Sequence, residues 1–350
     1  MRAPVSERVV RALVTGATGM VGHHIAERLL GDGWTVRVMV RDPGSTGARE
    51  LADLGLDVAP GNVLDQPSFV LAAQQCDVIF HAAAEIMTHG WESYRTVNVD
   101  GTRNAISAAA ASGARLVQVS SVAVYGSATR YLDDRRGMKT SEALPLMPLH
   151  ERAYYARSKR ESEELVMAAH AAGRIWATAV RPDVIYGRYD RQFVPRLARL
   201  LRFGIVPLVG RGRSTLAVVH AAAVADGAVR AATADIAGGR TYNLANDFDV
   251  TVREFFTYGA RGLGVGPHFV PVSTSMARGG LRATKGLVRL LSFGQARVGG
   301  SAALDFLSRD NPFTSERARV ELGWAPSVRP EVGVADAFAW AAARRARAGA

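Results

Sequence analysis

Three glycines that follow the first apolar run constrain the fold of this chain more than any other feature. Gly16, Gly19 and Gly22 are spaced G-x-x-G-x-x-G, between an apolar run at residues 9–15 and a helical pattern at 20–30. Glycine permits a tight turn and a close approach of the backbone to a pyrophosphate, and the start of a helix supplies free N–H groups and a partial positive charge. The motif therefore predicts a dinucleotide-binding site at the first strand–helix junction.

The first half of the chain continues as alternating strands and helices. Strand patterns lie at residues 35–40, 56–59, 78–81, 116–120 and 175–180, and helical patterns at 68–75, 91–111 and 151–172. This alternation predicts an α/β fold with a doubly wound parallel sheet, a Rossmann fold, and a smaller C-terminal region that covers the substrate.

The alternation loosens after Pro182, where prolines become frequent. We expect a dinucleotide-binding Rossmann domain at residues 1–181. Segments of about 215–245 should return to its sheet through the apolar runs 216–219 and 242–244. The substrate-binding region should comprise residues 182–214 and 246–340, followed by a basic tail at 341–350.

Composition narrows the class of protein. The net charge of +11 is spread along the 350 residues, and scattered arginines favour a solvated surface over a nucleic-acid partner. A single cysteine, Cys76, excludes a disulfide within the chain. No pair of histidines has metal-ligand spacing with a carboxylate, so we expect no metal. No targeting signal or membrane span is visible, so we expect a cytoplasmic protein.

The end of the second strand indicates which dinucleotide is bound. An NAD site places a carboxylate there for the ribose 2′-OH. In this chain the position falls on Val40, and Arg41 and Asp42 come next. A guanidinium suits a 2′-phosphate, so Arg41 favours NADP(H) over NAD(H). The alternative is that Arg41 is a surface residue that pairs with Asp42.

Tyr155 and Lys159 lie four residues apart in a helical pattern, and so on one face of the helix. With nine tyrosines and three lysines in the chain, chance predicts about 0.08 such pairs. A neighbouring ammonium lowers the pKa of a phenol, which can then exchange a proton with a carbonyl oxygen or an alcohol. Ser120 and Ser121 end the fifth strand, where a hydroxyl can orient the substrate oxygen.

These residues together resemble an extended short-chain dehydrogenase/reductase of the NAD-dependent epimerase/dehydratase superfamily, over nearly the whole chain. The matching motifs are TGATGMVG at 15–22, GNVLD at 61–65, HAAA at 81–84, NVDGT at 98–102, SSVAVYG at 120–126, Tyr155/Lys159, RPDVIYG at 181–187, TSERA at 314–318 and LGWAP at 322–326. The resemblance implies that Ser121 is the catalytic serine beside Tyr155 and Lys159.

The resemblance also implies which residues hold the cofactor. Asn62 and Val63 would lie by the adenine, Ala82–Ala84 by the ribose, and Pro182 and Val184 would flank the nicotinamide. The full expected set is Thr15, Gly16, Thr18, Gly19, Met20, Val21, Gly22, Arg41, Asn62, Val63, Ala82, Ala83, Ala84, Asn98, Ser120, Tyr155, Lys159, Pro182 and Val184.

Three departures refine the resemblance. Nucleotide-sugar enzymes of the superfamily usually carry Asn at the position of Val184, and the dehydratases carry an acid pair near the serine motif, where this chain has Val122 and Ala123. His220 is followed by alanines rather than by acidic or amide residues. With these departures, the chain most resembles the 3β-hydroxysteroid dehydrogenase and dihydroflavonol-reductase-like branch of the superfamily. The segment 307–313 also resembles the corresponding segment of that branch.

The leading hypothesis is an NADP-dependent oxidoreductase that reduces a ketone, or oxidises the alcohol, of a rather apolar small molecule. The alternatives are a nucleotide-sugar epimerase with tightly held NAD and a non-catalytic NADP-binding sensor. Alanine-rich helices around residues 102–112 and 161–173 predict a homodimer. The basic segment 276–298 is predicted to be a substrate cap rather than a helix lying on a membrane surface.

Overall fold

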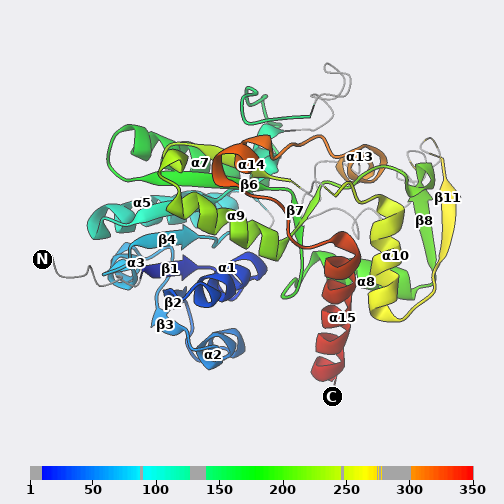
Figure 1. Cartoon of the computed structure of the whole chain (residues 1–350), viewed down its shortest axis with the longest axis horizontal. Helices are drawn as coiled ribbons and strands as arrows, with labels where there is room; N and C mark the ends of the chain where they lie inside the picture. The colour runs from blue at the N-terminus through cyan, green and yellow to red at the C-terminus, as the bar shows by residue number, and fades with distance from the viewer. Residues whose placement is uncertain are drawn as a thin grey trace, which may run out of the picture.

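The computed structural model describes residues 10–86, 90–126, 139–245, 248–273, 275, 277 and 301–349. Its centre is a seven-stranded, fully parallel sheet in the order β10-β6-β5-β4-β1-β2-β3 (Figure 1). The strands are β1 (Arg11–Thr15), β2 (Thr35–Val40), β3 (Asp57–Pro60), β4 (Val78–His81), β5 (Arg115–Val119), β6 (Ala177–Pro182) and β10 (Thr241–Leu244). The predicted doubly wound Rossmann sheet is confirmed.

Helices cover both faces of this sheet. One face carries α1 (Met20–Gly31), α2 (Thr46–Asp53), α9 (Ala221–Thr233) and α14 (Glu316–Leu322), and the other carries α3 (Gln66–Ala73), α5 (Gly101–Ser112) and α7 (Tyr154–Ala171). Ile25 and Leu29 of α1 belong to the first core, and Phe69 and Ile106 to the second. The strands are apolar on both sides because both faces are buried.

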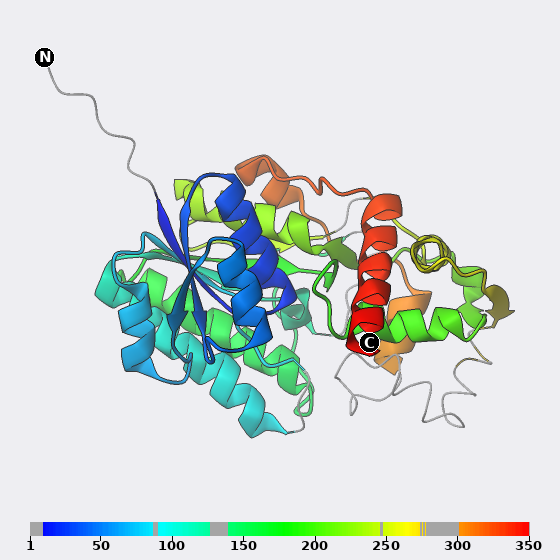
Figure 2. The ribbon, with the colours of Figure 1, turned by 90° about the horizontal axis from the view of Figure 1, so that it is seen from below.

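The second lobe lies beyond the carboxyl ends of the strands (Figure 2). It contains α8 (Phe193–Arg202), α10 (Val252–Leu263), α13 (Ser301–Ser308) and α15 (Pro330–Gly349), with the strand pairs β8 (Ile205–Val209)–β11 (His268–Val272) and β7 (Val184–Tyr186)–β9 (Val218–His220). Its own core includes Leu197, Phe255 and Phe338. Short 3₁₀ helices are η2 (Val122–Tyr125), η3 (Gly210–Gly212) and η4 (Asp235–Ala237).

Local structure departs from the sequence prediction at three places. The helix expected at 91–111 is α4 (Trp91–Tyr94), a π-helical turn η1 (Arg95–Asp100) and α5. Helix α2 was not predicted, although Ser45 caps it by accepting from the N–H of Ala48. The run 216–219 does not join the central sheet, because β9 pairs with β7 instead, whereas β10 does join it beside β6.

The C-terminal segment is helical, since α15 continues to Gly349 through the residues expected to form a basic tail. The basic segment 276–298 lies outside the described residues apart from Ala277. Among the helices that the structure describes, none is long and apolar enough to cross a membrane.

Candidate active site

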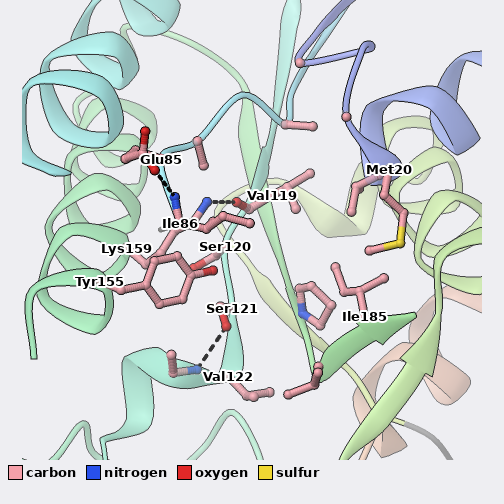
Figure 3. Close-up of a pocket in the computed structure, with 18 of the residues that line it drawn as sticks. Met20, Glu85, Ile86, Val119, Ser120, Ser121, Val122, Tyr155, Lys159 and Ile185 are labelled. Carbon is pink, nitrogen blue, oxygen red and sulfur yellow. Dashed lines mark hydrogen bonds between the residues drawn. The ribbon is translucent and has the colours of Figure 1, made fainter. Parts of the chain in front are cut away.

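A cavity of about 850 Å³ opens at the carboxyl ends of the central strands, between the sheet and the second lobe (Figure 3). Ligands of doubly wound folds bind at this edge because the strand order reverses there, between β1 and β4 in this chain. The volume falls in the usual range of ligand sites, about 300–1,000 Å³.

Gly16 and Gly22 pack the glycine-rich loop tightly against its neighbours. Gly16 has φ +71°, and a Cβ there would stand 2.7 Å from the backbone nitrogen of Ala83. A Cβ on Gly22 would stand 2.5 Å from the carbonyl oxygen of Gly16. Both positions require glycine, so the backbone of the loop comes close to its neighbours, while Thr18, Met20 and Val21 also line the cavity.

Arg41 follows the last residue of β2 and lines the cavity with an exposed side chain. It makes no ion pair with Asp42, whose Oδ1 accepts instead from the N–H of Gly44 at 2.9 Å. Within the described part of the chain Arg41 has no hydrogen-bond or ion-pair partner. Its guanidinium therefore stands at the end of β2 available to an anion.

Thr15 and His81 join the ends of β1 and β4 behind the cavity. Thr15 Oγ1 accepts from the N–H of Ala83 at 3.2 Å and shares a hydrogen bond of 2.9 Å with His81 Nδ1. Burial lowers the pKa of His81 to about 3, and the charge of Lys159 adds to this effect. His81 is therefore a neutral structural residue, and Thr15 does not line the cavity.

Asn98 lies in the π-helical turn and also stays behind the cavity lining. Its Oδ1 accepts from the N–H of Glu85 at 2.7 Å, and its Nδ2 donates to the carbonyl of Glu85 and to Ser158 Oγ. The side chain braces the segment after β4 against α7. Asn98 and Thr15 are thus the two expected cofactor residues that the structure places outside the cavity wall.

Tyr155, Lys159 and Ser121 meet in the cavity (Figure 3). The tyrosine ring points from α7 toward Ser121. Lys159 Nζ donates to the carbonyl of Val119 at 2.8 Å, which ties α7 to the end of β5. Ser121 also caps η2 by accepting from the N–H of Ala123 at 3.2 Å. The i, i+4 spacing thus brings the tyrosine and the lysine to one wall.

Burial sets the protonation states of this pair. It raises the pKa of Tyr155 to about 12, against the smaller opposing effect of Ser121, and lowers the pKa of Lys159 to about 8. The expected lowering of the tyrosine pKa by the lysine is not what the structure shows, because burial is the dominant effect on this phenol. At neutral pH the site therefore holds a neutral phenol, suited to donating a proton, and a largely protonated lysine.

A buried ion pair supports Lys159 from the next turn of α7. Glu163 accepts from Arg181 Nε at 3.0 and 3.1 Å, and Arg181 Nη1 donates to the hydroxyl of Tyr125 at 2.8 Å. The charge of Glu163 acts on Lys159 to raise its pKa, against the larger effect of burial.

The structure brings most of the expected residues together. Those on the cavity wall are Gly16, Thr18, Gly19, Met20, Val21, Gly22, Arg41, Asn62, Val63, Ala82, Ala83, Ala84, Ser120, Ser121, Tyr155, Lys159, Pro182 and Val184. Ser120 Oγ is buried and has no hydrogen-bond partner among the described residues, so it is available to a bound molecule.

The part of the cavity wall that sequence reasoning missed belongs to the second lobe and to two loops. It includes Glu85, Leu149, Ile185, Phe193, Arg196, Phe306, Arg309 and Phe313. Glu85 directly follows the Ala82–Ala84 motif, a signal that could have identified it. Ile185 lies in the 181–187 motif, and Arg309 and Phe313 lie in the segment 307–313, but neither motif marked them as wall residues. Leu149, Phe193, Arg196 and Phe306 carry no local signature, because they reach the cavity through the packing of distant segments.

The cavity fits a dinucleotide at one end and a second molecule at the other. Gly16 and Gly22 lie where a side chain would collide with the backbone, and Ser120 offers a buried hydroxyl without a partner. The fold and site thus define an NAD(P)-dependent oxidoreductase of the extended short-chain dehydrogenase/reductase class.

Comparison with known proteins agrees with this class. The profile of the NAD dependent epimerase/dehydratase family matches residues 12–245, and the chain belongs to that family. It is 30% identical over 328 residues to the 4-hydroxy-2-methyl-3-oxo-4-farnesyl-3,4-dihydroquinoline-1-oxide ketoreductase of Stigmatella aurantiaca, covering 93% of this chain and 95% of that protein.

Two further similarities extend the comparison. The 2-alkyl-3-oxoalkanoate reductase of Shewanella oneidensis is 28% identical over 345 residues, covering 94% of this chain and 86% of that protein. The UDP-glucuronic acid 4-epimerase of Bacillus cereus, solved with UDP-glucuronic acid and NAD, has a TM-score of 0.71 at 18% identity, covering 95% and 99% of the two chains. This last likeness concerns the fold alone.

Proposed function

We propose that this protein reduces a ketone of a rather apolar small molecule with NADPH, or oxidises the corresponding alcohol with NADP. The observation that carries the proposal is the meeting of Ser121, Tyr155 and Lys159 at a cavity whose far wall is mostly apolar. Among the described residues of that wall, the apolar surface comes from Leu149, Ile185, Phe193, Phe306 and Phe313.

The roles follow from the geometry and the protonation states. When bound, the nicotinamide supplies the hydride for the carbonyl carbon. Tyr155 donates its proton to the carbonyl oxygen, Ser121 orients that oxygen through its hydroxyl, and Lys159 places a positive charge beside the phenol. A phenol that is neutral at pH 7 carries the proton that reduction of a carbonyl requires, so its protonation state suits reduction.

Two relatives support a ketone as substrate, since one is named a ketoreductase and the other a 2-alkyl-3-oxoalkanoate reductase. An apolar substrate is supported by the aromatic residues of the second lobe. Val184 stands on the cavity wall where an amide would serve a sugar-nucleotide diphosphate, and valine cannot make that bond.

The preference for NADP rests on Arg41. Its exposed guanidinium at the end of β2 has no partner within the described residues and can bind a 2′-phosphate. Arg41→Ala should weaken NADPH binding far more than NADH binding. An equal loss of NADPH and NADH affinity in Arg41→Ala would contradict this preference, and so would a wild type that binds NADH more tightly.

The test of the reaction uses purified full-length protein, NADPH and a panel of apolar ketones that includes 2-alkyl-3-oxo acids, followed by nicotinamide absorbance. Ketone-dependent loss of NADPH supports the proposal. Turnover of a nucleotide sugar without net loss of cofactor, on protein that purifies with NAD bound, would establish the epimerase instead. NADP binding without turnover of any ketone or alcohol would favour the sensor.

A homodimer is part of the same proposal. Helices α5 and α7 lie side by side on one face of the sheet, and α5 presents the small residues Ala110 and Ala111 to solvent. Small side chains let helices of two copies approach closely. Light scattering at micromolar concentration should give twice the mass of the chain, and a monomer would contradict the proposal.

A further inference from the structure

Arg191 belongs to the second lobe but reaches the nucleotide-binding half. It lies in the connection between β7 and α8, which runs between α1 and α15 in Figures 1 and 2. Its Nη2 atom lies 3.7 Å from the point where a Cβ on Gly47 would stand, and that same point is 3.4 Å from Cγ2 of Thr18. The guanidinium therefore lies beside the first turn of α2 and the glycine-rich loop.

The connection that carries Arg191 is anchored on both sides. The ring of Tyr189 stacks on His23 of α1 with centroids 3.6 Å apart, and its hydroxyl donates to Glu27 at 3.0 Å. Asp190 accepts from the backbone N–H groups of the next residues, including that of Val194 at 2.8 Å. A backbone held in this way loses little freedom when Arg191 binds a ligand.

Arg188 adds a second anchor on the other side of the connection. Its Nε and Nη2 atoms donate to the two carboxylate oxygens of Asp336 on α15, each at 2.7 Å. Arg188 is thus neutralised, whereas Arg191, three residues further on, has no hydrogen bond or ion pair within the described chain.

The charged groups near Arg191 do not neutralise its positive charge. Partial burial and the guanidinium of Arg344 on α15 lower the pKa of Arg191, and the carboxylate of Glu50 on α2 offsets this only in part. An unpaired cation near a second cation is the arrangement that an anionic ligand stabilises.

The position of that anion follows from the fold. In a doubly wound nucleotide site the ribose 2′-position lies at the end of the second strand. Arg41 follows β2 directly, and α2 begins five residues later, with Gly47 in its first turn. Arg41 lines the cavity, and Arg191, which is not itself a lining residue, lies next to Thr18 of the cavity wall. A phosphate at this end of β2 would therefore have both guanidiniums nearby.

We propose that Arg191 is a second ligand of the NADP 2′-phosphate, supplied by the lobe opposite to Arg41. This inference rests on the NADP preference proposed above. Because the two guanidiniums come from different lobes, the 2′-phosphate links the connection before α8 to the nucleotide half, whereas NAD(H) lacks the group that makes this link.

The test measures calorimetric binding of adenosine 2′,5′-bisphosphate and of 5′-AMP to the purified full chain. These fragments report on the 2′-phosphate without turnover or nicotinamide. Arg191→Ala should weaken binding of the bisphosphate by about 10- to 100-fold, the usual effect of losing a charge-assisted bond, and leave 5′-AMP nearly unchanged. Arg199→Ala, an exposed arginine on α8, is the matched control and should change neither.

The outcomes separate this inference from the proposed function. If Arg41→Ala lowers the preference for the bisphosphate and Arg191→Ala does not, the role of Arg191 is wrong and the NADP preference stands. If the wild type binds the two fragments equally, the NADP preference and the role of Arg191 are both wrong. Ketone reduction with NADH is then tested by a separate measurement. Unchanged thermal unfolding of Arg191→Ala would show that a loss of binding is not a loss of fold.

Discussion

The two halves of the cavity are built in different ways. On the nucleotide side the wall is mainly backbone and small side chains at strand ends, as at Gly16, Gly22 and Ala83. On the side of the second lobe it is made of large side chains from separate segments, including Phe193, Phe306 and Arg309. The first half is suited to a ligand that many related proteins share, whereas the second can change its ligand by changing side chains. Substitutions on the nucleotide side should therefore change cofactor binding and the chemical step. Substitutions on the side of the second lobe should change which substrate is accepted.

Lys159→Ala should have the largest effect, because Lys159 belongs to the nucleotide side and to the chemistry together. The substitution removes the positive charge beside Tyr155, the bond to Val119 and the proposed contact with the cofactor. We expect kcat to fall by about 10³-fold or more, with weaker NADPH binding in addition. Steady-state kinetics and fluorescence titration of NADPH measure the two effects. Lys159→Arg should restore only part of the activity.

Tyr155→Phe should separate chemistry from cofactor binding. It keeps the ring and removes the proton donor, so kcat should fall by about 10²–10⁴-fold while NADPH still binds. Tyr154→Phe is the matched control, since Tyr154 is the neighbouring tyrosine on α7 and does not line the cavity. Near-normal turnover by Tyr155→Phe would refute the proposed mechanism. Ser121→Ala should be milder if Ser120 or water substitutes for the lost hydroxyl.

The pH profile should identify the group that titrates. Burial lowers the pKa of Lys159 to about 8 and raises that of Tyr155 to about 12. The protonated lysine is the active form, so kcat/KM for reduction should be constant near neutral pH and fall as pH rises through about 8. Lys159→Arg should lose this decline, because arginine stays protonated. A wild-type rate that is constant up to pH 10 would contradict the assignment.

Phe306→Ala should have the smallest effect and test the opposite side of the cavity. Removing an apolar wall residue should raise the KM of an apolar ketone by about 5- to 20-fold and leave NADPH binding unchanged. Phe203→Ala is the control, because Phe203 is 79% exposed and lies outside the cavity. An equal loss of NADPH affinity in Phe306→Ala would show that the two sides are not independent.

Much of the nucleotide half was predictable because its signals are local. The glycine spacing and the i, i+4 pair on α7 each depend on a few consecutive residues, and the structure places them on one cavity. Asn98 shows the limit of motif reasoning, since its motif matched the family but its side chain braces Glu85 and Ser158 instead. The interruption of the helix at 91–111 by a π turn has no signal in the apolar periodicity.

The sequence by itself determined the parallel sheet and the nucleotide loop, and it singled out the proposed acid–base pair, because backbone conformation and helix periodicity act over short distances. Only the tertiary structure decided that β9 pairs with β7 while β10 joins the central sheet. It also decided that burial raises the pKa of Tyr155 and that Arg191 lies beside α2. These features depend on packing between segments far apart in the chain, where many arrangements satisfy the same local pattern.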